Sequence, residues 1–259
     1  MYSDTIPEPR ILCWFSCGAT SAIATKIIVQ APQDHQIVIA YTHVAEEHSD
    51  NKRFLKDCEG WFGQDITILQ NAKYKSSIYE VISREQYLTG PFGSPCTKHL
   101  KRNVRESFQR HGDIHVLGFS AEEKSRADAF EERNPTLSCR FPLIDANLTK
   151  SDCLALLQRA GIELPAMYKL GYEHNNCIGC VKGKMGYWNK IRVDFPEIFK
   201  RMAEMERTIG ATINRKNGKS IYLDELDPHV GRGQREPSIE CGVFCEQAVL
   251  DPYTPKEAE

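Results

Sequence analysis

Short apolar runs alternate with longer stretches of mixed apolar and polar residues over the first two thirds of the chain. The runs have the length and apolar character of buried strands, and we expect strands at Ile11–Phe15, Ile37–Tyr41, Ile66–Leu69 and Val116–Phe119. The stretches between them predict helices at Thr20–Val29, Asn51–Phe62 and Lys98–Arg110. Strands separated by helical crossovers predict an α/β fold, with a mainly parallel sheet covered by helices on both faces. In such sheets, ligands bind at the carboxyl ends of the strands.

The last third has a different pattern. Thr149 and Asp152 resemble a capping box at the start of a helix that runs to Ala160, and an apolar stripe predicts a second helix at Asp194–Ile209. Asn217-Gly218 predicts a tight hairpin turn, and residues 227–240, rich in Pro, Gly and charge, predict an irregular arm. We therefore expect two domains: an α/β domain at 1–145, and a smaller C-terminal cysteine-bearing cap with an arm at 146–259.

Composition and charge narrow the class of protein. The 259 residues carry a formal net charge of −2, so no global basic field indicates a nucleic-acid partner. No apolar run is long enough to span a bilayer, and the polar start, with Asp4 and Glu8, lacks the pattern of a signal peptide. We expect a cytoplasmic protein with no membrane partner. In a reducing compartment its ten cysteines are more often metal ligands or redox nucleophiles than disulfides.

The segment Ser16-Cys17-Gly18-Ala19-Thr20-Ser21 joins the first strand to the first helix. Its small residues let the backbone approach a phosphate, and a helix N-terminus offers N–H donors and a favourable dipole. The alternative is a plain strand-to-helix turn with an N-cap.

This loop resembles the Ser-Gly-Gly-x-Asp-Ser signature of the ATP-pyrophosphatase (PP-loop) proteins, with Cys17 and Thr20 in place of its first Gly and its Asp. Phosphoadenosine-phosphosulfate (PAPS) reductases keep a similarly altered loop. Further segments resemble landmarks of that family in the same order: Gly118–Arg126, Phe141–Asp145, Met167–Tyr172 and Cys177-Ile178-Gly179-Cys180. The chain is thus similar to the PAPS reductase family, within the PP-loop superfamily, over residues 11–180.

The resemblance implies an adenine nucleotide alpha-hydrolase-like fold and an enzyme of sulfur metabolism that reduces an adenylyl sulfate (PAPS or APS) to sulfite. The alternative is an ATP-dependent sulfurtransferase that thiolates tRNA or DNA and carries an iron–sulfur cluster. A third hypothesis is a nucleotide- or redox-sensing module without turnover.

The resemblance also assigns site residues. Those expected to bind the nucleotide (PAPS, APS or ATP) are Ser16, Cys17, Gly18, Ala19, Thr20, Ser21, Gly118 and Glu123; the catalytic ones are Cys241, Lys101 and Arg126. Arg126 suits phosphate or sulfate because its guanidinium binds oxyanions in a fork. Its alternative is an ion pair with Glu122 or Glu123 one turn away. Glu240-Cys241-Gly242 resembles the mobile arm of thioredoxin-dependent reductases, whose cysteine attacks the sulfonyl sulfur, so a thioredoxin-like reductant is an expected partner.

The remaining cysteine pattern predicts a metal site. Cys177 and Cys180 have the spacing that brings two sulfurs to one metal, and Cys96 precedes a helix. We expect an iron–sulfur cluster, 4Fe-4S, held by Cys96, Cys177, Cys180 and Cys245, with Cys241 as the other candidate for the fourth ligand. Structural zinc and metal-free thiols are the alternatives, because thiolates suit both metals.

One segment combines basic and aromatic residues: Lys182, Lys184, Lys190 and Arg192 surround Tyr187 and Trp188. Such a segment can hold a nucleic-acid strand by phosphate contacts and base stacking. The interpretation that we favour is a solvated basic face whose aromatic rings pack into the cap, given the chain's net charge.

Overall fold

A computed structural model describes residues 8–90 and 93–231 of the chain. Among these residues two compact units are built from interleaved segments: a first unit from 8–43, 48–69 and 105–175, and a second from 44–47, 70–104 and 176–231. This division differs from the predicted one at residue 145. Residues 150–159 form a helix that packs on the sheet's first helix, which is why they belong to the first unit.

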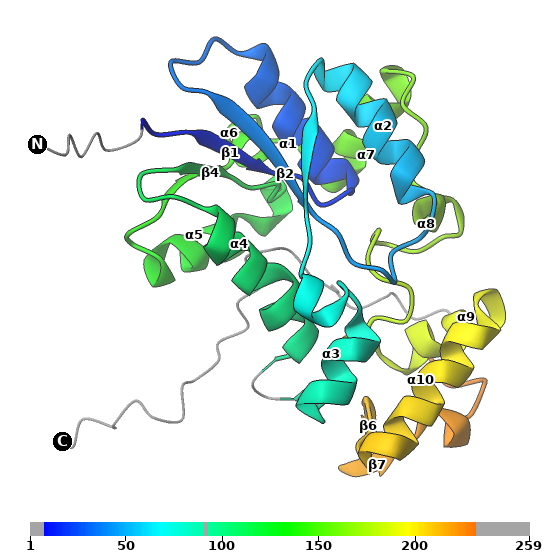
Figure 1. Ribbon diagram of the computed structural model, residues 1–259. Coiled ribbons are helices and arrows are strands. Elements are labelled where there is room, and N and C mark those ends of the chain that lie inside the picture. Colours follow the sequence, from blue (N-terminus) through cyan, green and yellow to red (C-terminus); the bar gives the residue numbers. More distant parts are fainter. Residues whose placement is uncertain (1–7, 91–92, 232–259) are drawn as a thin grey trace, which may run out of the picture. The chain divides into compact units, whose positions relative to one another are not determined.

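The first unit contains a five-stranded, fully parallel sheet, which confirms the α/β prediction (Figure 1). Its strands are β1 (Ile11–Trp14), β2 (Ile37–Thr42), β3 (Ile66–Leu69), β4 (Ile114–Val116) and β5 (Ser138–Arg140), in the order β3-β2-β1-β4-β5. Ile11 is in register with Ile37 on one side and with Ile114 on the other. The fourth strand begins two residues and ends three residues earlier than predicted, because the chain leaves the ladder after Leu117 donates its N–H to the carbonyl of Arg140.

Helices cover both faces of this sheet. On one face lie α1 (Ala19–Gln30), α2 (Asn51–Phe62), α6 (Pro142–Asp145) and α7 (Lys150–Arg159), which pack on alternate β1 residues, Ile11 and Cys13 (Figure 1). On the other face Trp14 contacts Phe108 at the end of α4 (Asn103–Phe108). The unit also contains η3 (Ala121–Glu123), α5 (Lys124–Arg133) and α8 (Ala166–Lys169). The predicted capping box at Thr149 and Asp152 is confirmed.

The second unit is mainly helical. It contains η1 (Ala72–Tyr74), α3 (Ile78–Glu85), the π-helix η2 (Thr97–Arg102), α9 (Met185–Asp194), α10 (Pro196–Ile209) and η4 (Leu223–Glu225). The single helix predicted at Asp194–Ile209 is wrong at its start: Phe195 leaves the helical conformation and Pro196 begins α10, a position where its missing N–H costs nothing. The predicted helix at Lys98–Arg110 is a π-helix followed by α4.

The predicted hairpin turn is confirmed. Strands β6 (Asn214–Lys216) and β7 (Lys219–Ile221) pair antiparallel, and the turn residues Asn217 and Gly218 have φ of 51° and 77°. Positive φ at both central residues is the requirement of a type I′ turn. Among the described residues, no helix has the length and apolar character needed to cross a membrane.

Candidate functional site

The strand order of the first unit reverses between β1 and β4, so the carboxyl ends of these two strands mark the switch point of the sheet. The Ser16–Ser21 loop follows β1, and Gly118 follows β4. A Cβ atom on Gly118 would lie 2.9 Å from both the N and the Cα of Ser21. Glycine is therefore needed at 118 for the two strand ends and the start of α1 to approach so closely.

The Ser16–Ser21 loop is shaped by its own hydroxyl groups. The Ser21 hydroxyl accepts hydrogen bonds from the N–H (3.1 Å) and the hydroxyl (3.0 Å) of Ser16, and donates to the carbonyl of Gly18 (3.0 Å). Within the described residues, the N–H groups of Thr20 and Ser21 have no hydrogen-bond partner. Unpaired N–H groups in the first turn of a helix form a ready anion site.

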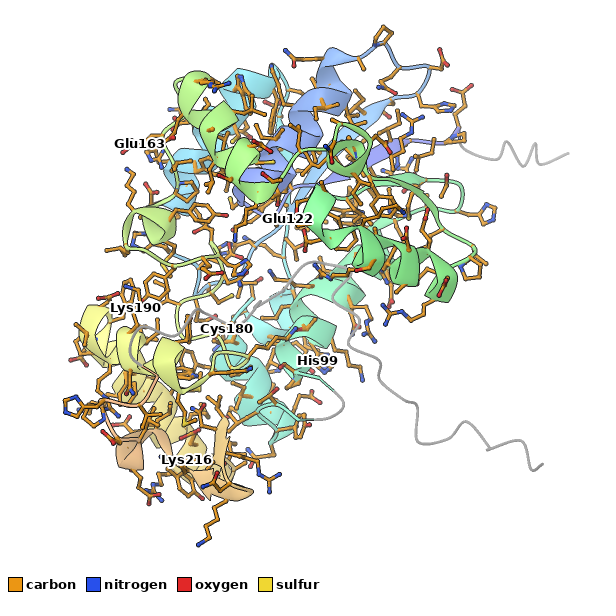
Figure 2. All side chains as sticks on the ribbon, turned by 180° about the vertical axis from the view of Figure 1, so that it is seen from behind. His99, Glu122, Glu163, Cys180, Lys190 and Lys216 are labelled. Atoms are coloured by element: carbon orange, nitrogen blue, oxygen red, sulfur yellow. The ribbon has the colours of Figure 1, made fainter. Side chains whose placement is uncertain are left out.

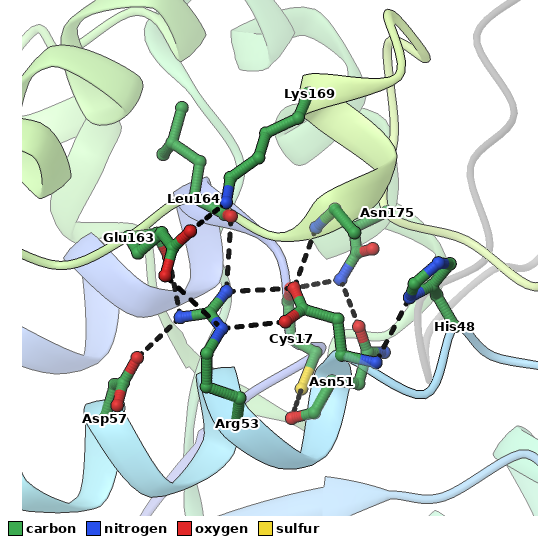
Figure 3. A network of polar contacts seen from close by, with 11 residues as sticks. Cys17, His48, Asn51, Arg53, Asp57, Glu163, Leu164, Lys169 and Asn175 are labelled. Atoms are coloured by element: carbon green, nitrogen blue, oxygen red, sulfur yellow. Dashed lines mark hydrogen bonds and ion pairs between the residues drawn. The ribbon is translucent and has the colours of Figure 1, made fainter.

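Two distant side chains hold this loop. The N–H of Ala19 donates to the Tyr168 hydroxyl (3.3 Å), and burial raises the pKa of Tyr168 to about 12. The Asn175 amide donates to the carbonyl of Cys17 (2.7 Å) and to Oδ1 of Asn51 (2.9 Å), as Figure 3 shows. Cys17 has φ of 57°, a left-handed conformation that is unfavourable for a residue with a side chain. The hydrogen bond from Asn175 to the Cys17 carbonyl stabilises this conformation.

Asn175 was not foreseen as a site residue. It is 7% exposed, and its Oδ1 has no hydrogen-bond partner in the part of the chain that the structure describes. Its partners lie 158 and 124 residues away in the sequence, so no local pattern points to it. In the sequence, Tyr168 belongs to the segment Met167–Tyr172 that carries part of the family resemblance, but no role was predicted for it.

Glu123 and Arg126 lie after β4 in the same unit. Glu123 accepts the Ser120 N–H in a capping box, and Arg126 forms an ion pair with Glu123 (2.6 Å) while its guanidinium lies 4.6 Å from the centre of the Phe119 ring. The ion pair expected in the alternative interpretation of Arg126 is therefore present, and its role toward an oxyanion stays a prediction. Nearby, His174 has a pKa lowered to about 4, mainly by burial and then by the charge of Lys150.

A second loop, Cys177–Cys180, lies in the second unit. Both thiols are buried and neither is in a disulfide. The Tyr187 hydroxyl accepts the N–H groups of Gly179 and Cys180 (3.0 Å each) and donates to the carbonyl of Cys177 (3.2 Å). Gly179 has φ of 75°, and a Cβ there would lie 2.8 Å from the Ile198 side chain, so glycine is required. One hydroxyl thus holds both ends of the loop, and the N–H of Ile178 donates to the carbonyl of Glu46 (2.9 Å).

The other predicted residues of this unit are Cys96 and Lys101. Cys96 directly precedes η2, and both side chains are buried. The Lys101 ammonium lies 3.9 Å from a carboxylate oxygen of Glu47. A π-helix is rare and is frequently found at functional sites.

The predicted metal ligands are brought together only in part. Cys96, Cys177 and Cys180 belong to one unit, and their thiols have the chemistry of iron–sulfur or zinc ligands. Within residues 8–90 and 93–231, however, no three His, Cys, Asp or Glu side chains are arranged to hold a metal ion. Cys241 and Cys245 lie outside the described residues. The cluster held by Cys96, Cys177, Cys180 and a fourth cysteine therefore stays a prediction.

The basic aromatic segment has the packing role that we favoured. Tyr187 and Trp188 are buried in the second unit, so neither ring offers a face for base stacking. Lys190 forms an ion pair with Asp194 (2.9 Å). Arg192 donates to the carbonyls of Leu223 (3.0 Å) and Leu226 (2.8 Å).

Comparison with known proteins adds little. No protein-family model matches the chain. A stretch of 97 residues, 38% of the chain, is 28% identical to an "uncharacterized 37.8 kDa protein in gpa 5′region" of Escherichia phage 186. The match covers 28% of that protein, well under two thirds of its length, and its name gives no activity.

Proposed function

We propose that the chain binds an adenine nucleotide at the Ser16–Ser21 loop and reduces an adenylyl sulfate to sulfite. The observation that supports nucleotide binding is the loop itself, at the switch point of a parallel sheet. There the N–H groups of Thr20 and Ser21 have no partner among the described residues, and Gly118 lets the end of β4 pack closely against the start of α1. The sulfur chemistry rests on the resemblance to PAPS reductases.

In this proposal the Cys241 thiolate forms a bond to the sulfonyl sulfur of the substrate. The bond between that sulfur and the bridging phosphate oxygen breaks, and its electron pair leaves with the adenosine phosphate. A dithiol reductant of the thioredoxin type then attacks the cysteine S-sulfonate, releases sulfite, and becomes a disulfide while Cys241 returns to the thiol. Arg126 would contribute by exchanging its Glu123 partner for a substrate oxyanion.

The test is an anaerobic assay of the full-length chain with PAPS or APS and a reduced thioredoxin. We expect sulfite and adenosine phosphate in equal amounts, and loss of both products in Cys241→Ser. Release of pyrophosphate from ATP, together with sulfur transfer to a nucleic acid, would instead support the sulfurtransferase alternative. Iron, sulfide and zinc analysis of the same anaerobic preparation tests the metal prediction: near-stoichiometric iron and sulfide would support the cluster, and a metal-free protein would contradict it.

Nucleotide binding has its own test, which does not depend on turnover. We expect Asn175→Asp to weaken binding of adenosine 3′,5′-bisphosphate at least tenfold in calorimetry, because the new carboxylate oxygen cannot donate to Cys17 or Asn51. Asn189→Asp is the matched control. Asn189 is also buried and donates to two carbonyls, those of Asp227 and Val230, but it lies in the second unit. Equal loss of affinity in both variants would contradict the role of Asn175.

A further inference from the structure

The β6–β7 hairpin is fixed at its base by one buried carboxylate. Glu206 in α10 is fully buried and accepts the N–H of Ile213, just before β6, and the N–H of Leu223, just after β7, both at 2.6 Å. One side chain therefore fastens both ends of the hairpin. Fixed ends and a type I′ turn make the hairpin a preformed element on the second unit.

The hairpin carries only positive charge. Arg215, Lys216 and Lys219 are exposed, and none forms an ion pair with another described residue (Lys216 is labelled in Figure 2). No acidic residue occurs between Ala211 and Leu223. The acids that follow, Asp224 and Glu225, are ion-paired with Arg207 at 2.7 and 2.6 Å.

This charge pattern costs stability. Lys216 lies directly opposite Lys219 in the antiparallel register, and like charges at such positions destabilise a sheet. Some exposed cations elsewhere do have an acidic partner one turn away, as in Lys124–Asp128 and Arg84–Glu80. A local conflict of this kind, on a preformed element, is typical of a binding surface.

We propose that the β6–β7 hairpin docks a nucleic acid by its phosphates. A two-stranded ribbon has the width to enter the major groove of a duplex. Lys216 and Lys219 lie on one face of the hairpin and Arg215 on the other, so the cations suit phosphates on both sides of the groove. Asn217 and Ser220 add exposed polar groups for sugar or base edges. From Arg215 to Ser220 the hairpin has no apolar side chain to insert into a membrane. This inference goes beyond the proposed function, because a small sulfonucleotide does not need such a surface.

The test measures binding of the full-length chain to fluorescent duplex DNA and to a structured RNA hairpin over a range of salt concentrations. The variant is Arg215→Gln/Lys216→Gln/Lys219→Gln. The matched control removes three exposed cations of the first unit: Lys52→Gln/Lys56→Gln/Arg159→Gln. We expect the hairpin variant to bind at least tenfold more weakly at about 100 mM salt, with the slope of log K against log salt reduced by about 2 to 3. The control should change affinity less than twofold.

Several outcomes would overturn the proposal: no binding by the wild-type chain, equal loss in the control, or equally tight binding to polyglutamate or to anionic vesicles. Folding is checked in the same samples, because relief of the Lys216–Lys219 repulsion should leave the unfolding free energy unchanged or higher. Lys216→Arg/Lys219→Arg, which keeps the charges, should retain binding. Binding of adenosine 3′,5′-bisphosphate should be unaffected in the hairpin variant, so this proposal and the proposed function can fail separately.

Discussion

The Ser16–Ser21 loop and the Cys177–Cys180 loop are both held by a tyrosine hydroxyl, but to opposite effect. Tyr168 takes one N–H of the first loop, that of Ala19, and the next two N–H groups stay without partners among the described residues. Tyr187 takes two N–H groups of the second loop, those of Gly179 and Cys180, and Ile178 donates its N–H to the carbonyl of Glu46. The first loop thus leaves two backbone donors without internal partners, whereas the second uses its donors internally.

This difference indicates which groups of each loop can bind a ligand or react. An anion can bind the first loop through the backbone, without a charged side chain in the loop itself. In the second loop the N–H groups of Ile178, Gly179 and Cys180 are used within the protein, and the thiols of Cys177 and Cys180 are the groups with the chemistry for reaction or metal binding.

The test with the largest expected effect disturbs the close packing of Gly118 against the Ser21 backbone. Gly118→Ala places a methyl group 2.9 Å from the Ser21 backbone, and overpacking against backbone should cost about 3 kcal/mol of unfolding free energy. It should also abolish nucleotide binding, since the start of α1 must move. The control is Gly60→Ala in α2, where no atom lies within 4 Å; it should stabilise the protein by about 0.5–1 kcal/mol. Denaturant titration and calorimetry measure both effects, and normal nucleotide affinity in Gly118→Ala would break the comparison.

The second test removes the clamp on the thiol loop. Tyr187→Phe leaves two buried N–H groups and one carbonyl without their partner, so we expect the unfolding free energy to fall by about 2 kcal/mol. Alkylation of Cys177 and Cys180 should become faster as the loop loosens. Tyr79→Phe is the control, because the buried Tyr79 hydroxyl has no hydrogen-bond partner in the described part of the chain. Similar losses in the two variants would mean that packing, not the hydroxyl, holds the loop.

The third test measures how the unfolding free energy depends on pH through two buried histidines of the first unit. Burial lowers the pKa of His115 and of His174 to about 4. Because an unfolded histidine titrates near 6.5, the unfolded state binds more protons between pH 6.5 and 4, and unfolding free energy falls as pH falls through that window. We expect a loss of about 1 kcal/mol per histidine by pH 5.5. His115→Gln keeps an acceptor for the Trp14 indole and should lose about half of the drop. His111→Gln, at an exposed position, should leave the drop unchanged.

The sequence predicted those features that depend on neighbouring residues. The helix Asn51–Phe62, the strand Ile66–Leu69 and the capping box at Thr149 follow from local periodicity and capping, and all three are confirmed. The Asn217-Gly218 turn is confirmed for the same reason. The fourth strand was misplaced because its limits are set by pairing with β1 and β5 rather than by its own residues.

The clamps could not be predicted, because they depend on tertiary contacts. Tyr168 lies 149 residues from Ala19, and Asn175 lies 158 residues from Cys17. The role of the hairpin was missed for a related reason. Arg215, Lys216 and Lys219 form no recognisable sequence motif. Only the strand register shows that Lys216 and Lys219 lie directly opposite each other. If the hairpin binds nucleic acid, the sulfurtransferase alternative becomes the stronger of the two hypotheses.

The interleaving of the two units has a consequence for synthesis of the protein. The central strand β1 pairs with β4, more than a hundred residues later, and the first unit includes residues up to 175. A nascent chain therefore cannot complete the first unit until α7 and α8 have left the ribosome, by which time β1, β2, α3 and η2 are already exposed. Such non-local pairing slows folding and prolongs the exposure of apolar strands. We expect nascent chains stalled before residue 175 to bind chaperones and to be cleaved readily by protease, and neither unit to be obtainable by a single cut in the gene.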